Sequence, residues 1–397
     1  MLNRYANGIL QGLPANRLLA IDAFRGLTIV AMILVNNPGS WRYVYDPLLH
    51  AQWHGWTPTD LIFPFFVFIV GLSIKIAIDR QLEAGHARAP IIKHAFIRMA
   101  KLVALGWFLA LFFYNFRDPS FSWVDERLLS MRIPGVLQRL GVVYFFTVLI
   151  VLHWRTTGRI VWALLLSFSY WAMLAFVPYS DAAGNQYQGL YDHGNNLASW
   201  LDQWVLGAAH VYDKKASPFV MDPEGILSTL PAIAGCLTGV LAGQFLMNDK
   251  IPLIKRILGL LSVGLVSVLL AEVWNGLLPI NKALWTPSFV LLSSGFACLT
   301  LGLCLWLIDH KGIKAWTAPF VVFGANAIAF YMFAAIVARV LLMLSVGDTS
   351  LKGWLYNQVF QPLFGNYNGS LAFALCFLAL SYVVMHWMYK RGWFWKV

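Results

Sequence analysis

Charged side chains are scarce in this chain of 397 residues, where Asp, Glu, Lys and Arg together make up only 12%. Hydrophobic residues account for 59%, and the mean hydropathy is +0.65. So little charge excludes a soluble globular protein. The composition therefore predicts a polytopic membrane protein.

Cysteine is rarer still. The four cysteines lie inside predicted helices and have neither metal-ligand spacing nor paired loop positions: Cys236, Cys298, Cys304 and Cys376. We expect small buried side chains, no disulfide framework and no metal site. Low-complexity tracts and short internal repeats are also absent from the sequence.

Apolar runs of the length that crosses a bilayer, roughly 20 residues, recur along the whole chain. They predict an all-α bundle of about ten transmembrane helices in one domain, 1–397, near residues 18–38, 59–79, 94–114, 136–153, 159–178, 225–246, 253–273, 285–308, 317–342 and 370–389. The first run follows a polar start, contains Asp22 and Arg25, and lacks a small-residue cleavage site. We therefore expect it to be a retained helix rather than a signal peptide.

The few charges predict the orientation of the bundle. Both termini and every second connection are basic, with Arg4, Arg17, Arg80, Arg88, Lys93, Arg155, Arg159, Lys250, Lys255, Lys311, Lys314, Lys390 and Lys396 among these positions. By the positive-inside rule both termini are cytoplasmic, in a multi-pass protein of the cytoplasmic (inner) membrane. The net charge of +11 is largely this signal and gives no reason to expect nucleic acid as a partner.

Two outward connections are unusual. The connection at about 179–224 is long and rich in Trp, Tyr, Asn and Asp; it is either a functional lid or a flap whose aromatic rings sit at the lipid headgroups. The stretch from His50 to Pro64 concentrates histidines, a carboxylate and aromatic rings between two apolar runs. These groups can accept protons, attack carbonyls and stack on sugars. The stretch predicts a reactive site at a membrane face.

Five segments resemble the heparan-alpha-glucosaminide N-acetyltransferase family. They begin at Arg17, His50, Arg132, Asp222 and Asn281, and in one-letter code they read RLLAIDAFRG with VN one helix length later, HAQWHG through FP, RIPGVLQRLG, DPEG and NKALW. The resemblance implies a membrane enzyme that moves an acetyl group from cytoplasmic acetyl-CoA to the amine of a glucosamine on the other side. No large soluble domain precedes the bundle in this sequence, so we expect a small amino sugar such as glucosamine as acceptor rather than a heparan chain.

The resemblance places the active-site histidine at His50 and a functional asparagine at Asn36. Acetyl transfer needs a nucleophile or base that is neutral near pH 7, and His50 could take the acetyl group or the amine proton. The alternative is a histidine that only caps a loop. Asp60 could orient His50, hold the substrate ammonium, or simply cap the next helix. We expect His54 to lie beside the site or on the surface.

The remaining candidates carry charge or hydrogen-bonding groups near predicted helix ends. Those expected to bind the acceptor, at the outer ends, are Arg132, Gln138, Arg139, Glu224, Asn281 and Lys282. An arginine within a spanning segment is costly unless it is paired or lines a wet cavity, which favours a role for Arg139. Glu224 and Lys282 could form a rim around the acceptor or pair with each other. At the inner end Asp22 and Arg25 could meet CoA, although a structural i, i+3 ion pair is the simpler interpretation.

Two other classes of protein fit parts of the sequence. An amino-sugar permease would use the polar helix interior as a transport site, but the repeated halves that such proteins show are not visible. A receptor or scaffold subunit would explain neither His50 nor the buried arginines. The expected partners are acetyl-CoA, a small amino sugar and membrane lipid, with a homodimer possible.

Overall fold

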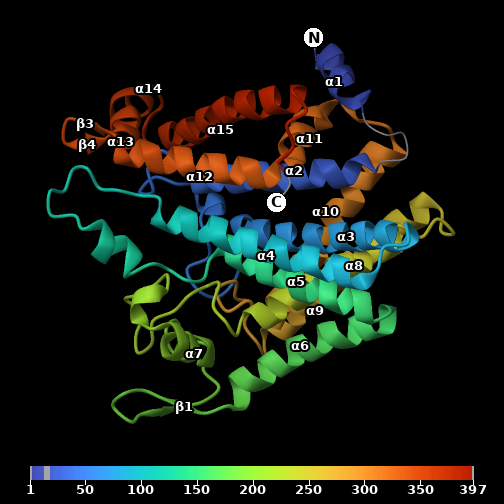
Figure 1. Ribbon diagram of the computed structural model, residues 1–397, viewed down its shortest axis with the longest axis horizontal. Coiled ribbons are helices and arrows are strands. Elements are labelled where there is room, and N and C mark those ends of the chain that lie inside the picture. Colours follow the sequence, from blue (N-terminus) through green and yellow to red (C-terminus); the bar gives the residue numbers. More distant parts are fainter. Residues whose placement is uncertain (1, 13–17, 396–397) are drawn as a thin grey trace.

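The structure is a computed structural model that describes residues 2–12 and 18–395, so Arg17 and Lys396 lie outside the described residues (Figure 1). Nine helices in the described part are long and apolar enough to span a membrane: α2 (Leu19–Asn36), α3 (Ile62–Glu83), α4 (Arg88–Leu111), α5 (Val136–His153), α6 (Thr156–Phe176), α8 (Thr229–Leu246), α9 (Leu253–Asn275), α10 (Pro287–Cys304) and α15 (Asn366–Lys390). A tenth span is made by two helices with a bend between them. The prediction of an all-α bundle with about ten spans is confirmed.

The bent span corrects the prediction of one continuous helix over 317–342. α11 (Ala318–Ala325) and α12 (Ala327–Met343) meet at Asn326 with an angle of 74°. The Asn326 carboxamide donates to the carbonyl of Trp393 at 2.8 Å and accepts the amide of Trp395 at 2.9 Å. At the break, hydrogen bonds to the C-terminal segment replace those of a continuous helix. A local pattern of apolar residues does not reveal such distant partners.

Shorter elements precede or lie between the spanning helices in the described part of the chain. Helices lie at α1 (Leu2–Leu10), α7 (Leu197–Leu206), α13 (Leu351–Leu355) and α14 (Gln361–Phe364), and tighter or wider turns at η1 (Asp46–Leu48), η2 (Pro58–Leu61), η3 (Val124–Leu128), η4 (Ala208–His210), η5 (Leu305–His310), η6 (Ala315–Thr317) and η7 (Tyr356–Phe360). Two small antiparallel hairpins pair β1 (Tyr179–Ser180) with β2 (Gln186–Tyr187) and β3 (Ser345–Val346) with β4 (Thr349–Ser350).

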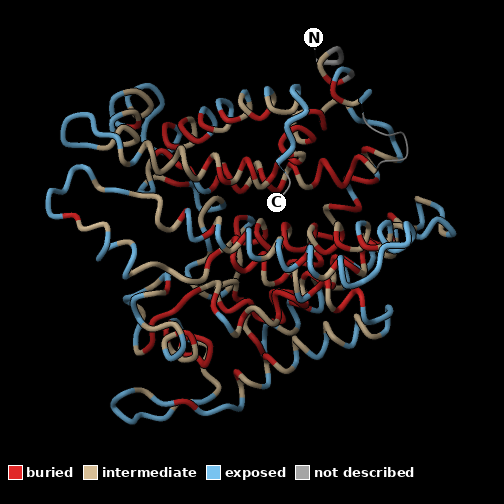
Figure 2. Tube along the Cα trace, in the orientation of Figure 1, coloured by how far each residue is buried: buried red, intermediate tan, exposed pale blue. Residues whose placement is uncertain are grey.

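The spanning helices form two groups that differ in burial (Figure 2). Helices α2, α3, α5, α8 and α10 are mostly buried, whereas α4, α6, α9 and α15 expose large apolar side chains such as Trp107, Leu165, Val273 and Leu380. An apolar surface of this kind suits contact with lipid acyl chains. Cys376 on α15 belongs to this exposed surface, which corrects the expectation that all four cysteines are buried.

Close packing in the buried group depends on glycine. A Cβ atom at Gly71 of α3 would lie 1.9 Å from the carbonyl oxygen of Cys236, and one at Gly239 of α8 would lie 2.0 Å from that of Phe68. Only glycine permits backbones to approach this closely. α3 and α8 thereby form a closely packed pair.

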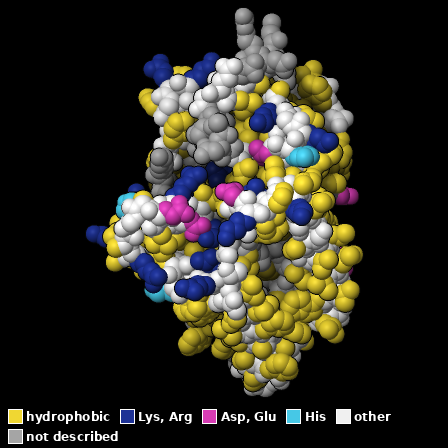
Figure 3. Space-filling model, turned by 90° about the vertical axis from the view of Figure 1, so that its right-hand side faces the viewer, with side chains coloured by type: hydrophobic (Ala, Val, Ile, Leu, Met, Phe, Trp, Pro, Cys, Tyr) yellow, Lys and Arg dark blue, Asp and Glu magenta, His cyan; other side chains and the backbone are white. Residues whose placement is uncertain are grey.

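The two ends of the bundle differ in structure. One end, on the left in Figure 1 and here called the loop end, carries the long connections 37–57, 112–135, 177–228, 276–286 and 344–365. The other, here called the opposite end, has short connections, and Lys and Arg side chains gather across it in Figure 3. The 177–228 connection is an ordered cap, because Tyr179, Leu197 and Phe219 pack with Tyr170 of α6 and Leu284 in a small core of their own.

Candidate active site

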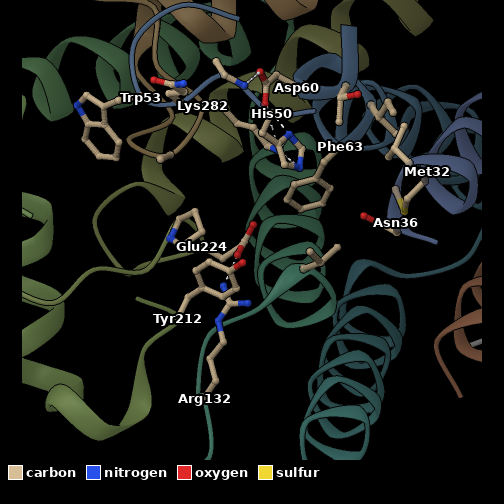
Figure 4. A pocket seen from close by; sticks show the side chains of 18 of the residues that line it. Met32, Asn36, His50, Trp53, Asp60, Phe63, Arg132, Tyr212, Glu224 and Lys282 are labelled. Atoms are coloured by element: carbon tan, nitrogen blue, oxygen red, sulfur yellow. Dashed lines mark hydrogen bonds and ion pairs between the residues drawn. The ribbon is translucent and has the colours of Figure 1, made fainter. Parts of the chain in front are cut away.

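A cavity of about 330 Å³ opens at the loop end between α2, α3, α5 and the connections above them, and is here called the His50 cavity (Figure 4). Six of the residues expected from the sequence line it: Asn36, His50, Asp60, Arg132, Glu224 and Lys282. These residues come from five separate segments of the chain. The fold therefore brings most of the predicted site into one place.

The connection before α3 is held in shape by one carboxylate. Thr57 and Asp60 form a capping box at η2, in which Asp60 Oδ2 accepts the amide of Thr57 at 2.9 Å. The same oxygen accepts the amide of Ala51 at 3.0 Å. Gly55, with φ of +91°, donates its amide to the carbonyl of Ile280 at 2.8 Å and joins this connection to the 276–286 connection. The loop is thus rigid where His50 leaves it.

Asp60 also orients His50. Its other oxygen, Oδ1, lies 2.7 Å from Nδ1 of His50, and its side chain is 1% exposed while that of His50 is 54% exposed. Because an ionised carboxylate only accepts hydrogen bonds, we assign the imidazole proton to Nδ1. Nε2 is then left with its lone pair, on a ring that lines the cavity. The sequence presents capping and orientation as alternatives for Asp60. In the structure Oδ2 caps η2 and Oδ1 orients His50.

Lys282 contacts the same pair. Its Nζ lies 3.0 Å from Nδ1 and 3.2 Å from Nε2 of His50, and 3.5 Å from Asp60 Oδ1. Burial lowers the pKa of Lys282, although the carboxylates of Asp60 and Glu224 act in the other direction. With the imidazole proton on Nδ1, the ammonium can donate only to Nε2 of the ring. It also provides a donor for an oxygen that gains charge during a reaction.

Arg132 and Glu224 form the facing wall, and Asp222 is buried behind them. The Arg132 guanidinium binds both oxygens of Asp222, with Nε 2.7 Å from Oδ2, and also contacts the Glu224 carboxylate. Tyr212 covers the guanidinium, its ring centroid 4.8 Å away. Burial would raise the pKa of Glu224, but the cations Arg132, Arg139 and Lys282 lower it overall. Glu224 is therefore ionised and pairs with Arg132, whereas Lys282 pairs with Asp60.

Asn36 lies on the other side of the cavity, beyond Phe63 (Figure 4). It is the last residue of α2, its side chain is exposed to the cavity, and within the described residues its carboxamide has no hydrogen-bond partner. The neighbouring Asn37 donates to Ile33 O at 2.8 Å and ends the helix. The structure thus leaves Asn36 available to a ligand and gives Asn37 a structural role.

Three residues expected to bind the acceptor do not line this cavity. Arg139 is 2% exposed and donates to the carbonyls of Pro223 and Gly225, both at 2.9 Å, so it fixes the wall that bears Glu224. Asn281 is fully buried, and its amide nitrogen donates to Trp53 O at 2.9 Å. Gln138 packs against Gly106 and Gly135. These groups shape the site from behind, since their polar atoms bond to the backbone or pack away from the cavity.

Asp22 and Arg25 lie elsewhere, toward the opposite end. Their side chains approach to 3.7 Å, and Arg25 Nη2 donates to the Ser73 hydroxyl at 2.8 Å. Arg25 also lines a second cavity of about 450 Å³, here called the Arg98 cavity, with His94, Arg98, Tyr144 and Trp395 among its walls. The Arg98 guanidinium lies 4.4 Å from the Tyr144 ring centroid. This cavity combines cationic and aromatic groups.

The two cavities are separated by about one helical turn. On α3 the His50 cavity is lined by Phe63 and the Arg98 cavity by Phe66. Val136 and Leu140 are related in the same way on α5, and Tyr331 and Ile328 on α12. Residues three or four positions apart are about 5 Å apart along a helix axis. Side chains alone therefore divide the two cavities on these three helices.

Some cavity residues had no signal in the sequence. Tyr212 and Tyr331 line the His50 cavity, yet aromatic residues are so frequent in the chain that neither stood out. Trp53 and Phe63, which also line it, belong to the stretch from His50 to Pro64 that the sequence singles out. His54 does not line the cavity, in agreement with the expectation; burial lowers its pKa, and Nδ1 lies 3.4 Å from the Asn281 amide.

Comparison with known proteins gives one consistent result. A family model described as "Heparan-alpha-glucosaminide N-acetyltransferase, catalytic" matches residues 17–257, more than half of the chain. A mouse protein named heparan-alpha-glucosaminide N-acetyltransferase is 31% identical over 425 residues, which cover 96% of this chain and 61% of the mouse protein. The human protein of the same name is 32% identical and is covered over 53% of its length, with 81% of this chain. The chain thus spans little more than half the length of these relatives.

Proposed function

Because this chain belongs to the heparan-alpha-glucosaminide N-acetyltransferase family, we propose that it transfers the acetyl group of cytoplasmic acetyl-CoA to an amino sugar on the other side of the membrane. One observation carries the proposal: Asp60 holds His50 through Nδ1 at 2.7 Å, so that Nε2 is the basic nitrogen of a ring that lines the cavity. A carboxylate that orients an imidazole in this way is a common arrangement for acyl transfer.

The reaction needs one proton acceptor and one donor for the carbonyl oxygen. His50 Nε2 takes a proton from the amine as the amine nitrogen bonds to the acetyl carbon. The carbon–sulfur bond then breaks, and the CoA sulfur leaves as a thiolate that takes up the proton. Lys282 and Asn36 supply the donors that favour the charge on the oxygen. If the acetyl group passes through His50 instead, the same nitrogen carries it, and protein quenched after mixing with acetyl-CoA alone is labelled.

The acceptor fits the walls of the His50 cavity. The ionised carboxylate of Glu224 suits the ammonium form of an amino sugar, and the rings of Trp53 and Tyr212 offer flat apolar surfaces of the kind that pack on sugars. We propose glucosamine or a closely related small amino sugar as the acceptor. Its amine must approach His50 in the unprotonated form to react.

Acetyl-CoA is proposed to enter through the Arg98 cavity. Arg25, His94 and Arg98 provide positive charge for its phosphates, and Tyr144 and Trp395 provide rings for its adenine. The pantetheine arm would then cross the single turn that divides the two cavities. We therefore propose that the basic opposite end faces the cytoplasm and the loop end faces outward from the inner membrane, the orientation that the positive-inside rule predicts.

Sealed vesicles of known orientation test the proposal. Acetyl-CoA supplied on the side of the opposite end should be consumed, and N-acetylglucosamine should appear on the side of the loop end. The orientation is checked by a cysteine at Ala183, on the loop end, and one at His86, each in a Cys376→Ser background because Cys376 is exposed. Glucosamine that crosses the membrane without acetylation would instead indicate a permease. Product only on the side that received acetyl-CoA would contradict transfer across the membrane.

A further inference from the structure

A third cavity, of about 710 Å³, adjoins the His50 cavity at the loop end and is here called the Arg339 cavity. It lies between the end of α4, the start of α5, α12 and the 112–135 connection. Arg132, Val136, Tyr212 and Tyr331 line both this cavity and the His50 cavity. These four residues form a wall shared by the two cavities, so a ligand at His50 lies one side chain away from the second compartment.

Positive charge predominates in the Arg339 cavity. Arg127, Arg339 and Lys214 line it, and Glu126 is the one acidic residue among its described lining residues. Arg132 also contributes to the wall, but Asp222 and Glu224 already neutralise it. No ion pair joins Arg127, Arg339 or Lys214 to a carboxylate in the part of the chain that the structure describes. The compartment thus has more positive than negative charge.

The direct contacts of the two arginines are with neutral groups. Arg339 donates to the carbonyl of Ala335 in its own helix at 3.0 Å. The Arg127 guanidinium lies 4.3 Å from the Phe113 ring centroid, and its Nε is buried without a hydrogen-bond partner. An arginine within a spanning helix such as α12 is costly unless it is paired or lines a polar cavity. Arg339 is therefore poorly explained by packing alone, and an anion from outside the chain would satisfy both guanidinium groups.

We propose that the Arg339 cavity binds an anionic group, a phosphate, sulfate or carboxylate, beside the acceptor site. The geometry suits this chemistry because guanidinium groups present parallel N–H donors to such anions. The evidence for anion binding is the cavity and its arginines. The effect of the anion site on the choice of acceptor rests on the proposed acetyl transfer. The acceptor would then be an amino sugar whose acidic substituent, or acidic neighbouring sugar, extends past Tyr212.

The same anion could come from a lipid. The 112–135 connection that carries Arg127 also exposes Phe116, Val124 and Leu129, and Leu342 of α12 lines the cavity. Apolar side chains exposed beside a cationic cavity suit the interface of the outer leaflet, where lipid phosphates lie. The two sources share one chemistry, and the experiment must separate them.

The first arm compares acceptors with the purified protein in neutral detergent. In the wild type, kcat/KM should be about tenfold or more higher for an acidic amino sugar than for glucosamine, because charge-assisted hydrogen bonds are the strong ones. The probes are glucosamine 6-phosphate, glucosamine 6-sulfate and a glucosamine–uronic acid disaccharide. Arg339→Gln and Arg127→Gln should lower the ratio of the two kcat/KM values toward one. Arg117→Gln, an exposed arginine on the same connection that does not line the cavity, should leave the preference unchanged.

The second arm tests the lipid source and does not require catalysis. The protein is placed in nanodiscs of phosphatidylcholine with or without phosphatidylglycerol, and its melting temperature is measured. Stabilisation by the anionic lipid that disappears in Arg339→Gln, but persists in Arg117→Gln, would assign the site to a headgroup. Wild-type protein that neither prefers an acidic acceptor nor responds to anionic lipid in this way overturns the proposal. If the wild type transfers no acetyl group to any acceptor, the proposed function is overturned. The second arm would still show whether the Arg339 cavity binds an anion.

Discussion

Oδ1 of Asp60 lies 2.7 Å from Nδ1 of His50, and Oδ2 of the same carboxylate accepts the amides of Ala51 and Thr57. The group that holds the loop in shape therefore also holds the imidazole. This coupling explains why a nearly fully buried carboxylate stands next to a largely exposed histidine.

Asp60→Asn should lower kcat by about 100-fold or more, because an amide can donate to Nδ1 and favour the tautomer with the proton on Nε2. Initial rates of acetyl transfer at saturating acetyl-CoA measure the effect. Asp46→Asn, an exposed carboxylate of the same connection, serves as the matched control. Equal rates in the wild type and Asp60→Asn, in protein of unchanged melting temperature, would show that Asp60 only caps η2.

His50→Ala should abolish detectable transfer while acetyl-CoA still stabilises the protein against heat, because His50 does not line the Arg98 cavity proposed for CoA. His54→Ala should keep activity within about threefold, since His54 lies outside the His50 cavity. Thermal shift with acetyl-CoA and product formation are measured on the same preparations. Activity retained in His50→Ala and lost in His54→Ala would mean that the wrong histidine has been chosen.

Arg98→Gln should raise KM for acetyl-CoA by about tenfold, with little change in KM for glucosamine, because Arg98 lines only the cavity proposed for CoA. Steady-state kinetics with each substrate varied in turn separates the two constants. Arg80→Gln is the control, since Arg80 lies exposed near the end of α3 and does not line that cavity. A larger effect on glucosamine than on acetyl-CoA would place the CoA site elsewhere.

Stability should depend on pH through Asp202 of α7. Burial raises its pKa from 3.8 to about 7, with the nearby Asp222 adding to the effect. A carboxylic acid whose pKa is higher in the folded state than in the unfolded state stabilises the fold while it is protonated. The contribution of Asp202 to stability is therefore largest below pH 4 and is lost as the pH rises to about 7. In the wild type the Ile226 amide donates to Oδ1 of Asp202 at 2.8 Å. Asp202→Asn keeps an oxygen for this amide but cannot ionise.

The difference in melting temperature, Asp202→Asn minus wild type, should therefore grow by about 3 °C or more between pH 5 and pH 8. Differential scanning fluorimetry across this range measures the difference. Asp348→Asn, an exposed carboxylate between β3 and β4, should show no such trend. Parallel curves for Asp202→Asn and wild type would mean that Asp202 is ionised throughout.

The number of spans and the position of His50 could be predicted because both depend on local features of the chain. The length of an apolar run decides whether a helix crosses the bilayer, whatever surrounds it. The composition of a connection likewise shows which reactive groups it holds. Nine of the ten predicted runs correspond to single long helices, and the stretch from His50 to Asp60 forms one wall of the cavity.

Tertiary structure alone decided which polar groups meet. Arg139 was expected to bind substrate, yet its guanidinium donates to the backbone carbonyls of Pro223 and Gly225. Asn326 bends a run that is apolar enough to continue, because the C-terminal segment offers its carboxamide two partners. Lys282 reaches His50 across 232 positions of the chain. A buried polar group must find a partner, and which partner lies within reach depends on how distant helices pack. The sequence alone determined where the chain crosses the membrane and which reactive groups lie between the crossings.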